Sequence, residues 1–408
     1  MPLQINLVKE PLVKSGNIFI SVLLLLTGAA ASGLYADDGT QRKDYLLISD
    51  MKVQIEATQA LNDMYNFKFA NAARQFHWLR QKYPEHPLPY FLMGLNEWWQ
   101  VMPNLDDESH DHRFEAYMDS TIMYAERLYR VDSSRVEGAF FLSASHGFKG
   151  RLYSERKKWL KAASAANKSL NFLENCRGKE ELSPELMFGD ALFNYFSVWI
   201  PENYPQLKPF LIWFSRGDKY LGLEQLRTVA HNAFYTRTEA QYWLMRILFV
   251  EENDPQSALH ESEYLYTTFP DNAYFHRYYA RMLYSTGRLI KAKMVSENLL
   301  AKTDSAKVGY EATSGRYACF FLGQIWESNM EAERAYGYYK RALSFSEEAK
   351  ATDSGYYLYS LMGLARICNQ LDRKDEARDY LKQVRKNSNR GHPANKQARD
   401  YMKSLKDD

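Results

Sequence analysis

Apolar residues recur every three or four positions from about residue 53 to residue 384, and short polar turns divide this pattern into segments. Such spacing is typical of amphipathic helices. The sequence therefore predicts consecutive antiparallel helix pairs over residues 53–83, 90–129, 136–173 and 186–230, with further pairs up to residue 384. Pro84 ends the first pair, since proline cannot continue a helix. Two insertions interrupt the pattern, at residues 104–112 and 200–217.

The pattern becomes a repeat in the second half of the chain. Residues 316–342 read RYACFFLGQIWESNMEAERAYGYYKRA, a helix with Leu322, Gly323 and Trp326 followed by a helix with Ala335 and Tyr339. Gly323 and Ala335 have almost no side chain, so the two helices can approach closely. One such pair cannot bury its apolar face alone, so neighbours must stack against it. Alanines recur at the equivalent place of neighbouring pairs, at intervals of 34, 43 and 42 residues: Ala258, Ala292, Ala335 and Ala377.

These features resemble the tetratricopeptide repeat, in which an aromatic-x₂-Leu-Gly-x₂-aromatic helix precedes a helix with Ala-x₃-aromatic, at a period of about 34 residues. The resemblance covers residues 52–384 with the two insertions. It implies an all-α protein, an α-solenoid of about seven to eight antiparallel helical hairpins. The implied domains are a signal peptide or N-terminal membrane anchor at 1–36, degenerate repeats at 37–238, regular repeats at 239–392 and a C-terminal capping helix at 393–408.

The resemblance also implies a binding surface, because the first helices of successive hairpins line a concave groove in this family. Aromatic and arginine side chains are the types that anchor protein interfaces. The family's carboxylate clamp pairs a basic residue with asparagine on adjacent first helices, and the equivalent places here hold no matching asparagine. We expect the groove to bind partner segments through Trp243, Tyr274, Arg277, Arg281, Tyr284, Tyr317, Phe320, Gln324, Tyr359, Met362 and Arg366.

The start of the chain has the order of a secretory signal peptide. Lys9 and Lys14 precede an apolar run at residues 18–26, and small residues follow at 27–36. An uncleaved membrane anchor is the alternative, since residues 18–36 are nearly long enough to span a bilayer. Either way the sequence predicts export of residues 37–408 to the periplasm or to a membrane-associated place in the cell envelope. The narrower resemblance to exported bacterial envelope tetratricopeptide proteins rests on this segment.

Composition and charge narrow the choice of partners. The 52 lysines and arginines nearly balance the 50 aspartates and glutamates, which disfavours nucleic acid as a partner. At residues 373–406 eleven basic residues accompany four acidic ones, and we interpret this stretch as a solvated cap. The three cysteines are few and odd in number, so no disulfide framework is predicted.

The sequence contains no P-loop and no G-x-G-x-x-G, G-x-S-x-G or H-E-x-x-H motif. The acidic insertion at residues 104–112 has metal-ligand residue types without ligand spacing, so neither a metal nor a cofactor is predicted. The insertion at 200–217 holds the apolar run PFLIWF at 209–214. That run is either a contact to a partner or a membrane, or a plug that fills the groove.

We therefore expect a protein that is not an enzyme but a scaffold of the cell envelope, which binds other envelope proteins or peptides in its concave groove. The alternative is an envelope module that binds a ligand or glycan, with the groove plugged by residues 200–217. An enzyme would need carboxylates or a nucleophile converging in the groove, and the sequence offers no such pair.

Overall fold

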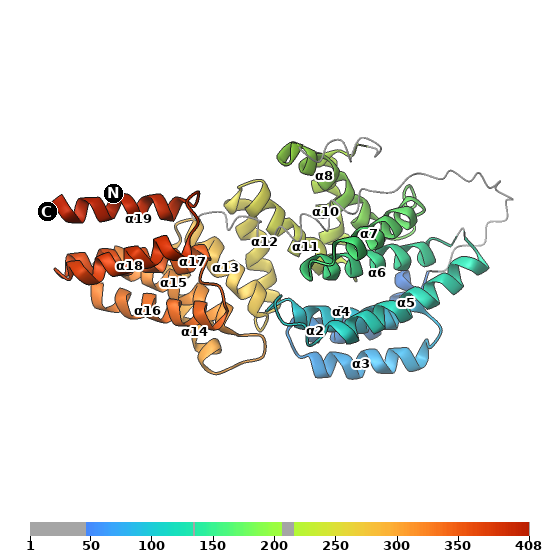
Figure 1. Ribbon diagram of the computed structural model, residues 1–408. Coiled ribbons are helices and arrows are strands. Elements are labelled where there is room, and N and C mark those ends of the chain that lie inside the picture. The colour runs from blue at the N-terminus through green and yellow to red at the C-terminus, as the bar shows by residue number, and fades with distance from the viewer. Residues whose placement is uncertain (1–45, 134, 206–215, 408) are drawn as a thin grey trace. The chain divides into compact units, whose positions relative to one another are not determined.

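The computed structural model describes residues 46–133, 135–205 and 216–407, and the regular elements within these ranges are all helices. The prediction of an all-α fold built from consecutive antiparallel helices is confirmed (Figure 1). Residues 1–45 and 206–215 lie outside the described residues. The predicted signal or anchor segment and the apolar run at 209–214 therefore stay predictions.

The chain divides into two compact units between Glu252 and Asn253. The sequence places the change from degenerate to regular repeats between residues 238 and 239. The division between the two units lies closer to the C-terminus. We call the described parts, residues 46–252 and 253–407, the N-terminal unit and the C-terminal unit.

In the N-terminal unit, α2 packs on α3, α4 on α5, α6 on α7, and α8 on α10. Helix α10 also packs on α11, which continues as a short π-helix, η5. The elements are η2 (Leu47–Ser49), α2 (Met51–Tyr65), α3 (Phe69–Lys82), α4 (Pro87–Val101), α5 (Asp111–Val131), α6 (Val136–Glu155), α7 (Trp159–Glu174), η3 (Pro184–Leu186), α8 (Met187–Asn203), α10 (Lys219–Asn232), α11 (Arg237–Arg246) and η5 (Ile247–Glu251).

The C-terminal unit is the more regular of the two. Helix α13 packs on α14 and α15, α15 on α16 and α17, and α17 on α18 and α19. We call α13, α15 and α17, which contact one another in this order, the first-helix row. The elements are α12 (Pro255–Thr268), α13 (Ala273–Ser285), α14 (Leu289–Asp304), α15 (Ala312–Ser328), α16 (Ala332–Glu348), α17 (Gly355–Gln370), α18 (Lys374–Asn387) and α19 (Pro393–Asp407).

A small buried residue at the fourth position of alternate helices explains how closely the helices pack. At Gly222, for example, an added Cβ would lie only 2.6 Å from the backbone nitrogen of Tyr195 on α8. Helix α5 departs from the pattern, since its fourth residue is Phe114. The residues are Ala72 in α3, Ala162 in α7, Gly222 in α10, Ala258 in α12, Ala292 in α14, Ala335 in α16 and Ala377 in α18.

The turns inside five hairpins share one conformation. In each, a residue with positive φ ends the first helix, and the N–H of the next residue donates to the carbonyl five positions before it, over 2.7–3.0 Å. This is the Schellman ending of a helix, which usually has glycine at the positive φ. Only one of the five residues is glycine. They are Phe67, Lys157, Gly287, Met330 and Asp372.

The core of the C-terminal unit is centred on the ring of Tyr339. A Cβ built on Gly323 of α15 would lie 2.7 Å from this ring, and one built on Gly363 of α17 would lie 2.4 Å from it. The ring is fully buried between the two glycines. Gly323 was predicted to allow a close helix contact at Ala335. In the structure it makes room for the ring of Tyr339, which lies one helical turn after Ala335.

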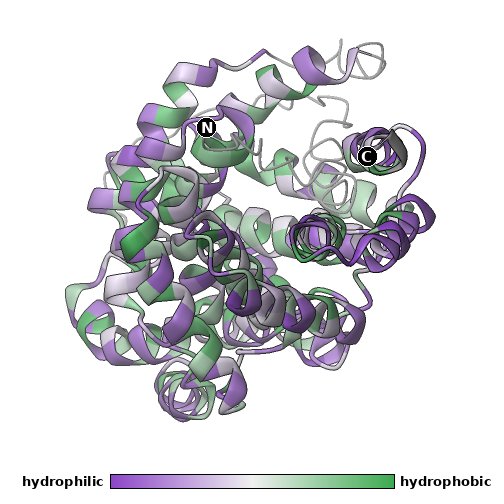
Figure 2. Cartoon of the chain, turned by 90° about the vertical axis from the view of Figure 1, so that its left-hand side faces the viewer, coloured by the Kyte–Doolittle hydropathy of each residue, from purple (hydrophilic) through white to green (hydrophobic). Residues whose placement is uncertain are grey.

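Most helices carry polar residues on one side and apolar residues on the other, so green and purple alternate along the ribbons (Figure 2). None of the described helices combines the length and apolar character that a membrane span requires.

Candidate functional site

The predicted groove residues fall into both units. Trp243 lies on α11 of the N-terminal unit, where it borders a cavity. The others lie on the first-helix row: Tyr274, Arg277, Arg281 and Tyr284 on α13, Tyr317, Phe320 and Gln324 on α15, and Tyr359, Met362 and Arg366 on α17. The structure therefore brings the residues of the C-terminal unit onto adjacent helices.

Arginines and tyrosines alternate along the row. The Nη1 of Arg277 donates to Ser314 Oγ at 3.3 Å, and its guanidinium lies over the rings of Tyr274 and Tyr317, at 5.3 and 5.9 Å from their centroids. Guanidinium groups in such positions are stabilised by the negative faces of the rings. Helix α13 is thereby linked to α15 by polar and aromatic contacts.

The same arrangement recurs one hairpin later. The Nη1 of Arg316 on α15 donates to Ser354 Oγ at 3.1 Å, and the guanidinium lies over Tyr317 and Tyr356, at 5.7 and 5.5 Å. Tyr317 is the shared wall between the two arginines. The row therefore presents a ladder in which each arginine lies between tyrosine rings and reaches a serine near the start of the next first helix.

Sequence reasoning missed three members of this ladder: Tyr278, Arg316 and Tyr356. Tyr278 stacks on Tyr274 with centroids 4.8 Å apart, and Tyr356 lies 4.3 Å from Tyr317. A signal was available, because the dipeptide Arg-Tyr at 277–278 recurs at 316–317. The predicted aromatic residues Tyr274, Tyr317, Phe320 and Tyr359 are all buried.

Other predicted residues belong to a second polar network, centred on Glu327 at the end of α15. Arg366 donates from Nε and Nη2 to both oxygens of Glu327, at 2.5 and 2.8 Å. Tyr339 OH donates to the same carboxylate at 2.5 Å, and Gln324 Nε2 donates to that hydroxyl at 2.7 Å. Burial disfavours the charged form of Arg366, yet the ion pair with Glu327 raises its pKa. Arg366 and Gln324 thus bind α15, α16 and α17 to one another.

The acidic insertion at residues 104–112 has a structural explanation. Arg156, at the end of α6, donates to both carboxylate oxygens of Asp111, at 2.6 and 2.7 Å. It also donates to the carbonyl oxygens of Leu105 and Asp107. The guanidinium of Arg156 therefore stabilises the conformation of the insertion by bonding to several of its residues. Within the described ranges, no group of three or more His, Cys, Asp or Glu side chains could hold a metal ion.

The cysteines do not form a reactive site. Cys176, Cys319 and Cys368 are free and buried. Burial raises the pKa of the Cys176 and Cys319 thiols to about 12, so they stay protonated and unreactive near neutral pH. Cys319 packs as a small side chain within α15, and the Cys176 thiol, in the turn after α7, donates to the carbonyl oxygen of Phe172.

No protein-family model and no curated protein matches the chain. Solved structures that the chain matches include the crystal structure of yeast Tom70, with 13% identity, a TM-score of 0.36, and 87% of this chain and 81% of that chain covered. Another is the TPR domain of P58(IPK), with 15% identity, a TM-score of 0.25, and coverage of 87% and 98%. The helix packing described above is itself that of a tetratricopeptide-like helical repeat protein.

Proposed function

We propose that this chain is a non-enzymatic protein-interaction scaffold whose first-helix row binds an acidic segment of a partner protein. The observation that supports this proposal is Arg316. It is only 7% exposed, it lies between two tyrosine rings, and it forms no ion pair with any residue that the structure describes. Its Nε also has no hydrogen-bond partner among those residues. Buried arginines are usually paired, and a carboxylate from a partner would supply the missing charge.

The ladder fits an extended acidic segment. Arg277 on α13 and Arg316 on α15 lie on adjacent helices of the first-helix row, so carboxylates spaced along a peptide can reach both. Each carboxylate can accept a charge-assisted hydrogen bond from one guanidinium while tyrosine rings exclude water around it. Arg281 lies one turn after Arg277 on the same helix and adds a third positive charge.

We expect Arg277→Ala combined with Arg316→Ala to weaken the binding of an acidic peptide by about 2 kcal/mol or more, which is close to a thirtyfold loss of affinity. The probe is a fluorescent ten-residue peptide of alternating aspartate and phenylalanine, and the measurement is fluorescence anisotropy at low and high salt. A peptide with lysine in place of aspartate should not bind. Circular dichroism checks that the variants stay folded.

The matched control is Lys396→Ala with Lys403→Ala, which removes two exposed positive charges from α19. It should leave the affinity within about twofold, since solvated charges contribute little. Arg277→Lys with Arg316→Lys keeps the charge and removes the planar fork, so an intermediate loss is expected. An Arg277→Ala, Arg316→Ala variant that is folded and binds as well as the wild type would contradict the proposal.

We further propose that the scaffold acts in the cell envelope, because residues 1–36 have the order of a signal peptide or anchor. Fractionation of native cells should recover the chain outside the cytoplasm. Leu23→Arg with Leu25→Arg should retain it inside, since charges in the apolar run block insertion. Recovery of the wild-type chain from the soluble cytoplasm with an intact N-terminus would exclude export.

A further inference from the structure

A cavity of about 150 Å³ lies inside the N-terminal unit, bordered by α4, α6, α7, α8 and α11. Its walls are mostly aromatic and aliphatic side chains. A cavity of about this size can hold a benzene-sized molecule. The principal apolar wall residues are Phe91, Phe148, Leu173, Phe193, Phe196 and Trp243.

Three residues of the cavity wall each have a buried polar atom without a hydrogen-bond partner among the described residues. The atoms are the Oε2 of Glu239, the Nε of Arg151 and the hydroxyl of Tyr235. The three residues are 3%, 8% and 4% exposed. Buried polar atoms in native proteins nearly always have a partner, so three unpartnered ones around one cavity indicate that something else fills it.

Only one carboxylate oxygen of Glu239 accepts hydrogen bonds from residues that the structure describes. Its Oε1 accepts from Trp99 Nε1 at 2.9 Å and from Tyr65 OH at 3.4 Å. Burial raises the pKa of this carboxyl, and the positive charge of Arg151 partly opposes that shift. The Oε2 is therefore either an acceptor or, when protonated, a donor.

Arg151 is fixed on the other side of the cavity. Its Nη2 donates to Tyr242 OH at 2.7 Å, and its guanidinium lies over the rings of Trp98 and Trp243, at 4.6 and 5.2 Å. Neither Arg151 nor Glu239 takes part in an ion pair with a residue that the structure describes. When Glu239 is ionised, the two opposite charges balance each other, and a ligand with a net charge would leave one of them unbalanced, which favours a neutral ligand.

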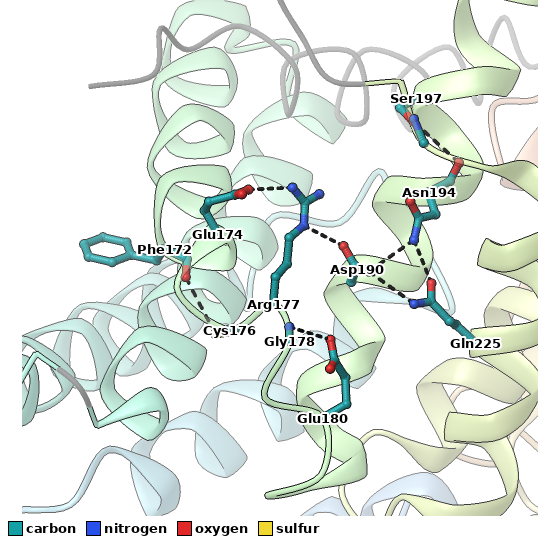
Figure 3. Close-up of polar contacts among 11 residues, drawn as sticks. Phe172, Glu174, Cys176, Arg177, Gly178, Glu180, Asp190, Asn194, Ser197 and Gln225 are labelled. Carbon is teal, nitrogen blue, oxygen red and sulfur yellow. Dashed lines mark hydrogen bonds and ion pairs between the residues drawn. The ribbon is translucent and has the colours of Figure 1, made fainter. Parts of the chain in front are cut away.

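The α8 wall is held in place by a separate polar network, shown in Figure 3. Arg177 donates to both Glu174 and Asp190, and Asp190 accepts from Asn194 and Gln225. The guanidinium of Arg177 also lies 4.4 Å from the centroid of the Phe193 ring, which borders the cavity. These contacts hold the cavity-bordering part of α8 against the turn that follows α7.

We propose that this cavity binds a small, uncharged aromatic molecule that carries one hydroxyl group. The ring packs among the aromatic walls in the edge and face arrangements that such rings prefer. The hydroxyl meets Glu239 Oε2, and it can donate to that oxygen when the carboxyl is ionised or accept from it when the carboxyl is protonated. The same hydroxyl oxygen can accept from Arg151 Nε or Tyr235.

The test uses the full chain and isothermal titration calorimetry with four probes: phenol, benzene, benzoate and benzylammonium. We expect phenol to bind at least tenfold more tightly than each of the others. Equal binding of phenol and benzene would overturn the proposal, because the cavity would then be a packing void. Tightest binding of benzoate or benzylammonium would overturn it in favour of a charged ligand. No binding of any probe would leave water as the occupant and would also overturn it.

Variants locate the binding. Ala144→Leu and Leu192→Phe each fill the cavity from its wall and should weaken phenol binding at least tenfold. The matched control, Ala301→Leu, adds the same group at an exposed position of α14 and should change nothing. Glu239→Gln replaces Oε2 by an amide that only donates, so the preference of phenol over benzene should fall at least threefold. Folded cavity variants with unchanged phenol binding would overturn the proposal, and an unchanged preference in Glu239→Gln would overturn the role given to Glu239.

Discussion

Glu185→Ala is expected to destabilise the N-terminal unit by about 3–5 kcal/mol, because it removes a buried acceptor that serves four donors. Glu185 is 1% exposed and lies in η3. Its Oε1 accepts from the backbone nitrogens of Phe234 and Tyr235, at 2.6 and 3.0 Å. Its Oε2 accepts from the nitrogen and the hydroxyl of Thr236, at 2.8 and 2.6 Å.

Urea unfolding followed by circular dichroism measures this loss. Glu185→Gln keeps one acceptor oxygen, so about half of the loss is expected. The control is Glu224→Ala on the exposed side of α10, which should change the free energy of unfolding by less than about 0.5 kcal/mol. Hydrogen exchange should also become faster at the amides of residues 234–236. A Glu185→Ala variant as stable as the control would show that water or a rearranged backbone replaces the carboxylate.

Gly363→Ala is expected to destabilise the C-terminal unit by about 1–3 kcal/mol through overpacking. The new Cβ would lie 2.4 Å from Cε2 and 2.5 Å from Cζ of Tyr339. The ring cannot withdraw, because Gly323 approaches its other side and its hydroxyl is held by Gln324 and Glu327. Gly323→Ala should be destabilising for the same reason.

Another glycine of the same unit provides a control, because its replacement by alanine is expected to raise stability instead of lowering it. Gly337 lies on α16, is exposed, and has no atom within 4 Å of a built Cβ. Gly337→Ala should therefore raise stability by about 0.5–1 kcal/mol, since alanine favours the helix. Thermal melting of the three variants compares the effects directly. If Gly363→Ala melts at or above the temperature of Gly337→Ala, the packing of Tyr339 between two glycines is not what limits the helix spacing.

The sequence alone was sufficient for the all-α fold and for the order of the helices, because both depend on local features. Helical spacing of apolar residues acts within a few turns, and Ala258, Ala292, Ala335 and Ala377 mark the same contact wherever it recurs. The equivalent small residues Ala162 and Gly222 were not recognised, since the sequence around them lacks the other residues of the tetratricopeptide motif. The conformation of the turns at Phe67, Lys157, Met330 and Asp372 was also hidden, because ordinary residues there adopt the positive φ that usually signals glycine.

The sites depended on tertiary structure, because each joins residues from helices far apart in the chain. Arg366 was predicted as a groove residue, and only the fold shows that Glu327, 39 residues away, accepts both of its hydrogen bonds. Arg316 was not predicted as a groove residue, yet its guanidinium lies between the rings of Tyr317 on α15 and Tyr356 on α17. Glu239 and Arg151 carry no motif at all. They are identified as site residues by their burial, because a buried polar atom without a partner is energetically costly. Burial depends on how several helices pack together, so no single helix sequence reveals it.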